Sequence, residues 1–191
     1  MDFLRKLIAV AALASPLSAF AATFPIATSG DGLRVLANTN LAVNATYQGN
    51  SASFSNDLYL VTNDGIANND IFIFNNKTSK VGSTVNLGSF AVGTELEFRL
   101  YVNDTKTSYY TGAASRNPGN HIHARVQQNG ALNTTLVSFE DLLNGPFDYN
   151  DLSFSFTNTQ ASSAIPEPAS LLLFGLGLAG LAAGRRRNAR D

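Results

Sequence analysis

The sequence of 191 residues contains no cysteine and no tryptophan, and only 14% of its residues are charged. The absence of cysteine excludes disulfide bridges, thiolate metal sites and cysteine nucleophiles, so the fold depends on burial of a core. The low charge content excludes a charge-rich disordered chain, and a mean hydropathy of +0.01 excludes a protein with many membrane spans. Length and composition therefore predict a single folded domain.

The first 21 residues have the three-part layout of a secretory signal peptide. Arg5 and Lys6 form a short basic start, an apolar stretch follows, and the small-residue triplet Ala19-Phe20-Ala21 closes the segment. Signal peptidase cleaves after such a triplet. We therefore predict that residues 1–21 are removed and that the mature chain begins at Ala22.

The last 27 residues, 165–191, combine a proline-rich start, an apolar run over residues 169–184 and a cluster of arginines. As a helix rising 1.5 Å per residue, the apolar run spans roughly 24 Å, enough to cross a thin bilayer. Arginines at a helix end remain on the cytoplasmic side of the membrane, which leaves the preceding domain outside the cytoplasm. The pattern predicts a transmembrane helix at residues 169–184.

This tail resembles a known sorting signal through three features in order. The triplet Pro166, Glu167 and Pro168, the apolar helix, and the cluster of Arg185, Arg186 and Arg187 together resemble the PEP-CTERM signal of Gram-negative bacteria. The resemblance implies processing by a membrane-embedded exosortase, transient anchoring in the inner membrane, and a final location at the cell surface or in the medium. It also implies a link to exopolysaccharide and the biofilm matrix. A plain single-span anchor is the alternative.

Between the two ends the chain is acidic. Residues 22–164 contain eleven acidic and seven basic side chains, which gives a net charge of about −4. The segment has no basic patch with interleaved aromatic residues of the kind that holds a phosphate backbone. Nucleic acid is therefore excluded as an expected partner.

The hydrophobic pattern of this middle segment has a period of two. Between residues 94 and 102, four apolar side chains alternate with Glu95, Glu97, Arg99 and Tyr101, as in a strand with one buried face. Further strands are expected at 33–36, 41–47, 58–62, 71–74, 84–90, 121–126, 136–139 and 152–157. Turn residues separate them, which is typical of an all-β, antiparallel sandwich or jelly roll. We expect this domain at residues 22–158 and a flexible spacer at 159–164.

The densest polar group in the sequence lies between the last two expected strands, around a Gly-Pro turn. Carboxylate and amide oxygens at this spacing suit Ca²⁺, which takes six to eight oxygen ligands. The loop lacks the spacing of an EF-hand, so only an irregular site is expected. The alternative is a loop held by side chains that accept backbone N–H bonds, without a metal. The candidate ligands are Glu140, Asp141, Asp148, Asn150 and Asp151.

The same five residues carry a second resemblance. Together with the sequence before them, they make residues 108–156 similar to the bacterial domain-of-unknown-function family 4114. The resemblance implies a β-rich domain exposed outside the cell. The resemblance does not assign a catalytic activity, because none is defined for this family.

Three other groups of residues are candidate sites. His121 and His123 lie on one strand face and suit a shared metal or two solvated side chains. Glu95 and Glu97 have the spacing of a glycosidase acid pair, or are ordinary charges on the wet face of a strand. Tyr101, Tyr109 and Tyr110 are a candidate surface for stacking on sugar rings, or ordinary cross-strand aromatics.

The sequence thus favours an exported, non-enzymatic surface or matrix protein that associates with exopolysaccharide and is stabilised by Ca²⁺. Its expected partners are signal peptidase and exosortase during processing, the membrane through the C-terminal helix before processing, and exopolysaccharide. A carbohydrate-active hydrolase and a purely structural calcium-binding matrix protein are the alternatives.

Overall fold

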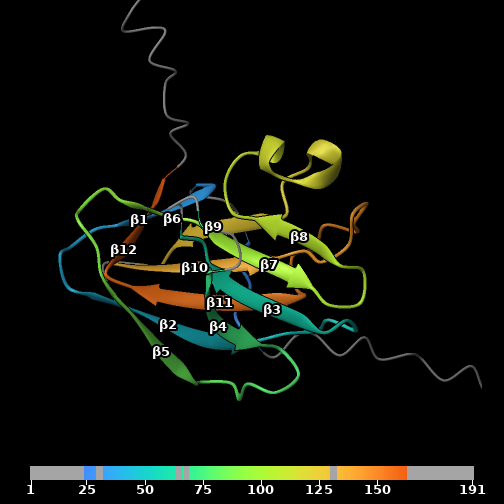
Figure 1. Cartoon of the computed structure of the whole chain (residues 1–191), viewed down its shortest axis with the longest axis horizontal. Helices are drawn as coiled ribbons and strands as arrows, with labels where there is room; N and C mark the ends of the chain where they lie inside the picture. The colour runs from blue at the N-terminus through green and yellow to red at the C-terminus, as the bar shows by residue number, and fades with distance from the viewer. Residues whose placement is uncertain (1–23, 29–31, 63–65, 67–68, 130–132, 163–191) are drawn as a thin grey trace, which may run out of the picture.

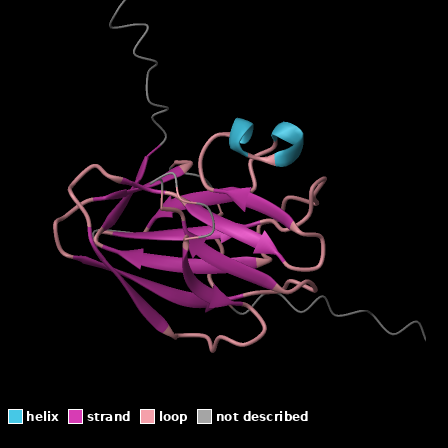
Figure 2. Cartoon of the chain, in the orientation of Figure 1, coloured by secondary structure: helices cyan, strands magenta, loops and turns pink. Residues whose placement is uncertain are grey.

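The computed structural model describes residues 24–28, 32–62, 66, 69–129 and 133–162. Almost all regular structure in these ranges is strand, with two short 3₁₀ helices, η1 (Ala114–Arg116) and η2 (Pro118–Asn120) (Figure 2). The strands are β1 (Arg34–Ala37), β2 (Ala42–Gly49), β3 (Asn56–Leu60), β4 (Ile71–Asn75), β5 (Thr84–Ser89), β6 (Glu95–Leu96), β7 (Phe98–Val102), β8 (Thr107–Tyr110), β9 (Ala124–Gln128), β10 (Thr134–Phe139), β11 (Leu152–Thr157) and β12 (Thr159–Ser162).

The strands form three sheets, in which all paired strands are antiparallel. The largest sheet has the order β5-β2-β11-β10-β9, the second has the order β4-β3-β7-β8, and the smallest has the order β12-β1-β6. Figure 1 shows the four-stranded sheet in front of the five-stranded one. The expectation of an all-β, antiparallel fold is confirmed.

Aromatic side chains from the two larger sheets meet in one core. Phe98 of β7 stacks on Phe156 of β11 with 4.1 Å between ring centroids, and Phe74 of β4 lies 6.0 Å from Phe154 of β11. Phe98, Phe154 and Phe156 are fully buried. The period-two pattern of the sequence separates a buried face from an outer face in strands such as β7, because successive side chains of a strand point to opposite sides. In β10, by contrast, both faces are buried over most of the strand.

The expected strand over residues 94–102 is divided between two sheets. β6 pairs with β1, whereas β7 pairs with β3 in the four-stranded sheet. Glu97 lies at the break between the two strands. The side-chain pattern continues across the break, so hydrophobic periodicity alone did not reveal the change of partner.

Residues 159–162, which lie in the predicted flexible spacer, form the strand β12, so the prediction is wrong for these four residues. This strand pairs with β1 over four residues, from Ala37 opposite Thr159 to Arg34 opposite Ser162. Thr159 is fully buried, and its hydroxyl bonds the hydroxyl of Thr135 at 2.9 Å. A polar Ser/Thr stretch joins a sheet here because strand pairing uses backbone groups and needs no apolar side chain.

Several predicted segments lie outside the described residues. These are the signal peptide at 1–21, the helix at 169–184, and the sorting residues Pro166, Glu167, Pro168, Arg185, Arg186 and Arg187. Within the described ranges, no helix has the length and apolarity needed to cross a membrane.

Candidate functional site

The acidic loop, residues 140–151, connects β10 to β11, and its two ends lie side by side because these strands are paired. Phe139, the last residue of β10, pairs with Leu152, the first residue of β11. Glu140 and Asp141 therefore leave the sheet beside Asp151, which enters it. Antiparallel pairing brings these three carboxylates together although ten positions separate Asp141 from Asp151.

The three carboxylates form a compact and largely buried group, called here the acidic cluster. One oxygen from each of Glu140, Asp141 and Asp151 lies within 4.8 Å of the others. Glu140 is 0% exposed and Asp141 is 3% exposed. Backbone N–H groups hold two of the side chains: Asp141 N donates to Asp151 Oδ2 at 2.8 Å, and Leu142 N donates to Glu140 Oε1 at 3.1 Å.

Asn56 completes the group from a distant part of the chain. This first residue of β3 is 0% exposed, and its Nδ2 donates to Asp141 Oδ2 at 2.7 Å. Its Oδ1 has no hydrogen-bond partner among the described residues, and neither does Glu140 Oε2. A buried acceptor without a donor costs about 1–3 kcal/mol. The acidic cluster thus contains one buried oxygen, Glu140 Oε2, that a cation would satisfy, and the neighbouring Asn56 carries a second buried oxygen without a donor among the described residues.

The electrostatics of the cluster are unfavourable without a counter-ion. Burial, reinforced by the charges of Asp141 and Glu140, raises the pKa of Asp151 to about 8. Burial also raises the pKa of Glu140, and the charges of Asp148 and Asp141 add to the effect. None of the ion pairs in the described part of the chain includes a member of the cluster. Like charges held together in this way favour either protonation or a bound cation.

The side chains of the cluster are ligands of hard cations. The three carboxylate oxygens lie within 4.8 Å of one another, close enough to share one ion. Carboxylate oxygens suit Ca²⁺ and Mg²⁺, and a ligand set without histidine or cysteine disfavours zinc.

Two of the five ligands expected from the sequence do not join this group. Asn150 donates its side-chain N–H to Asp148 Oδ2 at 2.6 Å and also contacts the hydroxyl of Ser51. Asp148 is exposed. These two residues form a polar turn further along the loop, which is the local role that the alternative interpretation gave to the whole loop.

The predicted pair of histidines is divided by the fold. His121 is exposed, whereas His123 is fully buried with its ring stacked on Tyr109 at 3.9 Å. Burial lowers the pKa of His123, and its Nδ1 lies 3.2 Å from the carbonyl oxygen of Glu140. The prediction that both histidines lie on one solvated face of a strand is therefore wrong. Both residues precede β9, so the alternation of side chains along a strand does not apply to them.

Glu95 and Glu97 are bound to arginines. Glu95 pairs with Arg34 at 3.3 Å and with Arg116 at 2.6 Å, and Arg116 also lies 3.2 Å from Glu97. Burial raises the pKa of Glu97, which the charge of Arg116 opposes. A glycosidase pair needs one carboxyl free to protonate the substrate and one free to attack it or to activate water. The arginines engage both side chains, which disfavours this chemistry.

The three candidate tyrosines do not share one surface. Tyr109 is 2% exposed and packs inward, so it is wrong as a residue that stacks on an external sugar. Tyr101 and Tyr110 are partly exposed on the opposite face of the same sheet. Strand alternation separates Tyr109 from Tyr110, since adjacent residues point to opposite faces.

Comparison with known protein families finds a match in the C-terminal tail. Residues 164–187 match the model of the PEP-CTERM protein-sorting motif. The chain carries a PEP-CTERM sorting motif. No curated protein and no solved structure matches the chain.

The PEP-CTERM motif determines the route of this protein. A chain with this motif is exported, processed by exosortase, and anchored transiently in the membrane through its C-terminal region. The motif covers only the tail, so it assigns no role to the acidic cluster. The resemblance of residues 108–156 to family 4114 stays a prediction.

Proposed function

We propose that this PEP-CTERM protein is a non-enzymatic component of the cell surface or extracellular matrix, with a calcium-stabilised β-sandwich that associates with exopolysaccharide. The observation that carries the proposal is the acidic cluster of Glu140, Asp141 and Asp151, together with buried oxygens of Glu140 and Asn56 that receive no hydrogen bond from the part of the chain that the structure describes. The resemblance to the PEP-CTERM and 4114 families supports the surface location. Signal peptidase and exosortase act on the two ends during export.

Calcium suits both the site and the location. Three carboxylates carry enough charge to hold a divalent cation, and bound water supplies the remaining ligands. Extracellular modules bind Ca²⁺ with dissociation constants of about 10⁻⁴–10⁻³ M, so the ion is retained outside the cell and is lost in the cytoplasm. Calcium then takes the role that disulfides have in many exported domains, in a sequence with no cysteine.

The test is thermal unfolding of the protein recovered from the producing bacterium, with Ca²⁺, with Mg²⁺, or with a calcium chelator. A ligand present at 100 times its dissociation constant stabilises by about 2.7 kcal/mol, which raises the melting temperature of a domain of this size by about 10 °C. We expect this shift with Ca²⁺ and a smaller one with Mg²⁺. Equal melting temperatures with calcium and with chelator would contradict the proposal.

Asp151→Asn gives a sharper test, because its expected effect on stability is opposite in chelator and in calcium. In chelator at neutral pH the variant should be more stable than the wild type, since its amide is neutral and folding no longer requires the Asp151 carboxyl, with its pKa raised to about 8, to take up a proton. In calcium it should be less stable, since it removes a ligand. Asp148→Asn, in the same loop but outside the cluster, is the matched control and should retain the calcium shift.

The two rival functions give different results. A carbohydrate-active hydrolase would release reducing sugars from the polysaccharide of the producing bacterium, which the arginine-bound Glu95 and Glu97 disfavour. A purely structural calcium-binding protein would show the calcium shift but would not bind that polysaccharide. Hydrolysis and retention assays on the same preparation therefore separate all three functions.

A further inference from the structure

The outer face of the four-stranded sheet carries a row of large side chains that crosses every strand. In the strand register, Tyr59 of β3 is opposite Phe72 of β4 and Arg99 of β7, and Arg99 is opposite Tyr110 of β8. Residues directly opposite one another on neighbouring strands lie on the same face of the sheet. Their neighbours Leu58, Leu100 and Tyr109 are buried in the core, so this row faces outward.

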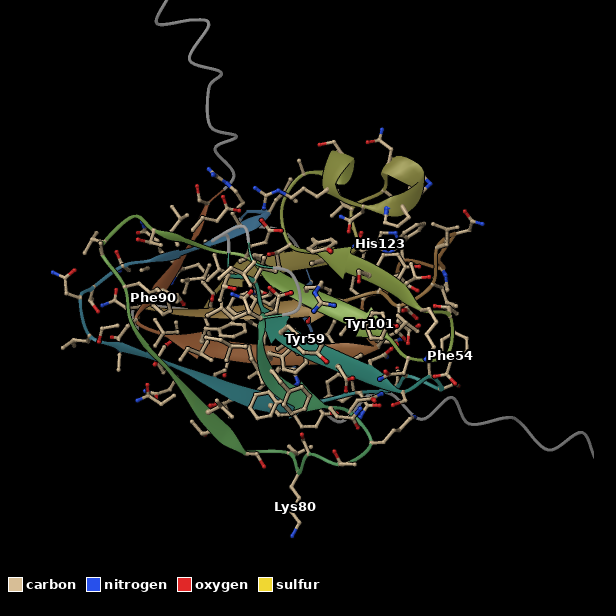
Figure 3. The ribbon with its side chains drawn as sticks, in the orientation of Figure 1. Phe54, Tyr59, Lys80, Phe90, Tyr101 and His123 are labelled. Carbon is tan, nitrogen blue, oxygen red and sulfur yellow. The ribbon has the colours of Figure 1, made fainter. Side chains whose placement is uncertain are left out.

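A pocket of about 310 Å³ opens on this face and is lined by Tyr59, Asp70, Arg99 and Tyr101. Figure 3 labels Tyr59 and Tyr101 on the sheet that faces the viewer. The Arg99 guanidinium carbon lies 4.3 Å from the ring centroid of Tyr59 and 5.9 Å from that of Tyr101. The Arg99 guanidinium thus lies within cation–π distance of both rings that line the pocket.

An ion pair fixes the polar part of the pocket. Asp70 Oδ2 accepts hydrogen bonds from Arg99 Nε at 3.0 Å and is 2.9 Å from Arg99 Nη2. The backbone N–H of Thr62 donates to the other oxygen of Asp70 at 3.2 Å. Because these contacts hold the guanidinium and the carboxylate in place, a ligand that uses them meets little entropic cost of ordering.

The chemistry of the pocket selects a class of ligand. Aromatic rings offer flat apolar area, which matches the C–H face of a pyranose ring. A guanidinium beside a carboxylate presents donors next to acceptors, as neighbouring sugar hydroxyls require. The two charges of the pair cancel, and the domain has a net charge of about −4, so an anionic polymer is disfavoured.

From this geometry we propose that the pocket binds an uncharged sugar residue of an extracellular polysaccharide. Tyr101 supplies the stacking surface, Arg99 and Asp70 supply the hydrogen-bonding groups, and Tyr59 supports Arg99. The inference rests on the proposed association with exopolysaccharide and locates it at residues that differ from the acidic cluster. It also divides the predicted tyrosine surface, since Tyr101 lines the pocket while Tyr109 does not.

The test is affinity gel electrophoresis of full-length variants expressed in, and recovered from, the producing bacterium. The gels contain dextran, alginate, or the deproteinised polysaccharide released by that bacterium. The variants are Tyr101→Ala, Tyr101→Phe and Arg99→Gln, with Leu41→Ala as the control. Leu41 is 65% exposed, precedes β2 of the five-stranded sheet and does not line the pocket. Thermal unfolding of each variant verifies that it is folded.

We expect an uncharged polymer, either dextran or an uncharged bacterial polysaccharide, to retard the wild type. Tyr101→Ala and Arg99→Gln should weaken this binding about tenfold, the equivalent of about 1.4 kcal/mol. Tyr101→Phe, which keeps the ring, and Leu41→Ala should bind as the wild type does. Two results would overturn the proposal that this pocket binds an uncharged sugar but would leave the proposed function standing. One is wild-type affinity in both Tyr101→Ala and Arg99→Gln, and the other is retardation by alginate alone. Absence of retardation by all three polymers overturns both proposals.

Discussion

Single side chains in the core hold the two larger sheets together, and the stacked pair of Phe98 and Phe156 is the closest aromatic contact between them that the described residues make. Both rings are fully buried. Phe156→Ala should lower the free energy of unfolding by about 3–5 kcal/mol, because it removes buried area and leaves a cavity. Urea denaturation measures this loss.

Phe72→Ala is the control for that experiment, since Phe72 is 52% exposed on the outer face of β4. It should cost less than about 1 kcal/mol, as surface substitutions usually do. Similar losses in the two variants would mean that the two sheets do not share the core described above.

The buried carboxyl of Glu97 gives a prediction about pH. Burial raises its pKa above the ordinary value despite the nearby Arg116. For a group with a raised pKa in the folded state, the contribution to stability is complete below the unfolded pKa and is lost as pH rises through the folded pKa. Glu97→Gln stays neutral at every pH, so its stability relative to the wild type should increase as the pH rises above the ordinary glutamate pKa of about 4.3.

Urea midpoints across this pH range measure the effect. A variant that loses stability relative to the wild type as pH rises would show that the ion pair with Arg116 outweighs the cost of burial. Glu95→Gln is a useful comparison. Glu95 forms ion pairs with both Arg34 and Arg116, so loss of its charge should destabilise the protein at neutral pH.

Among the elements, β12 has the most direct test. It covers one edge of β1, and the hydroxyl of Thr159 bonds both Thr135 and the carbonyl of Phe156. A chain that ends at Asn158 should lose at least about 2 kcal/mol of stability relative to one that ends at Ser162, since each hydrogen bond contributes about 1 kcal/mol. Thermal unfolding followed by circular dichroism compares the two chains. Equal stability would indicate that residues 159–162 act only as a spacer.

Periodicity predicted most of the elements, because alternation of apolar and polar side chains reports which face of a strand is buried. The strands from Phe98 to Val102 and from Leu152 to Thr157 follow this pattern. The pattern does not report backbone pairing, so the polar strand β12 and the division of residues 94–102 between two sheets required the structure.

The part of the candidate site that comes from one segment of the sequence could be predicted. Glu140, Asp141 and Asp151 lie in one loop, and their composition indicated a hard cation. Asn56 could not be found in this way, since it lies 85 positions from Asp141 and no feature of its own segment marks it as a ligand. Tyr59 and Asp70 were missed for the same reason, although alternation had already placed Arg99 and Tyr101 on one outer face.

At the scale of the whole molecule, the sorting motif and the two proposed sites lie in different parts of the chain. The PEP-CTERM motif occupies residues 164–187, and the described strands end at Ser162. The acidic cluster and the sugar pocket both lie within the described domain. The predicted removal of residues 1–21 and of the tail would therefore leave both proposed sites intact.

The intact mass of the protein recovered from the cell surface and medium tests the central claim most directly. The account predicts a chain that begins at Ala22 and lacks the residues after the Pro166-Glu167-Pro168 triplet, with the tail retained in a strain without exosortase. A full 191-residue chain in the cytosol, unchanged by loss of exosortase, would contradict it.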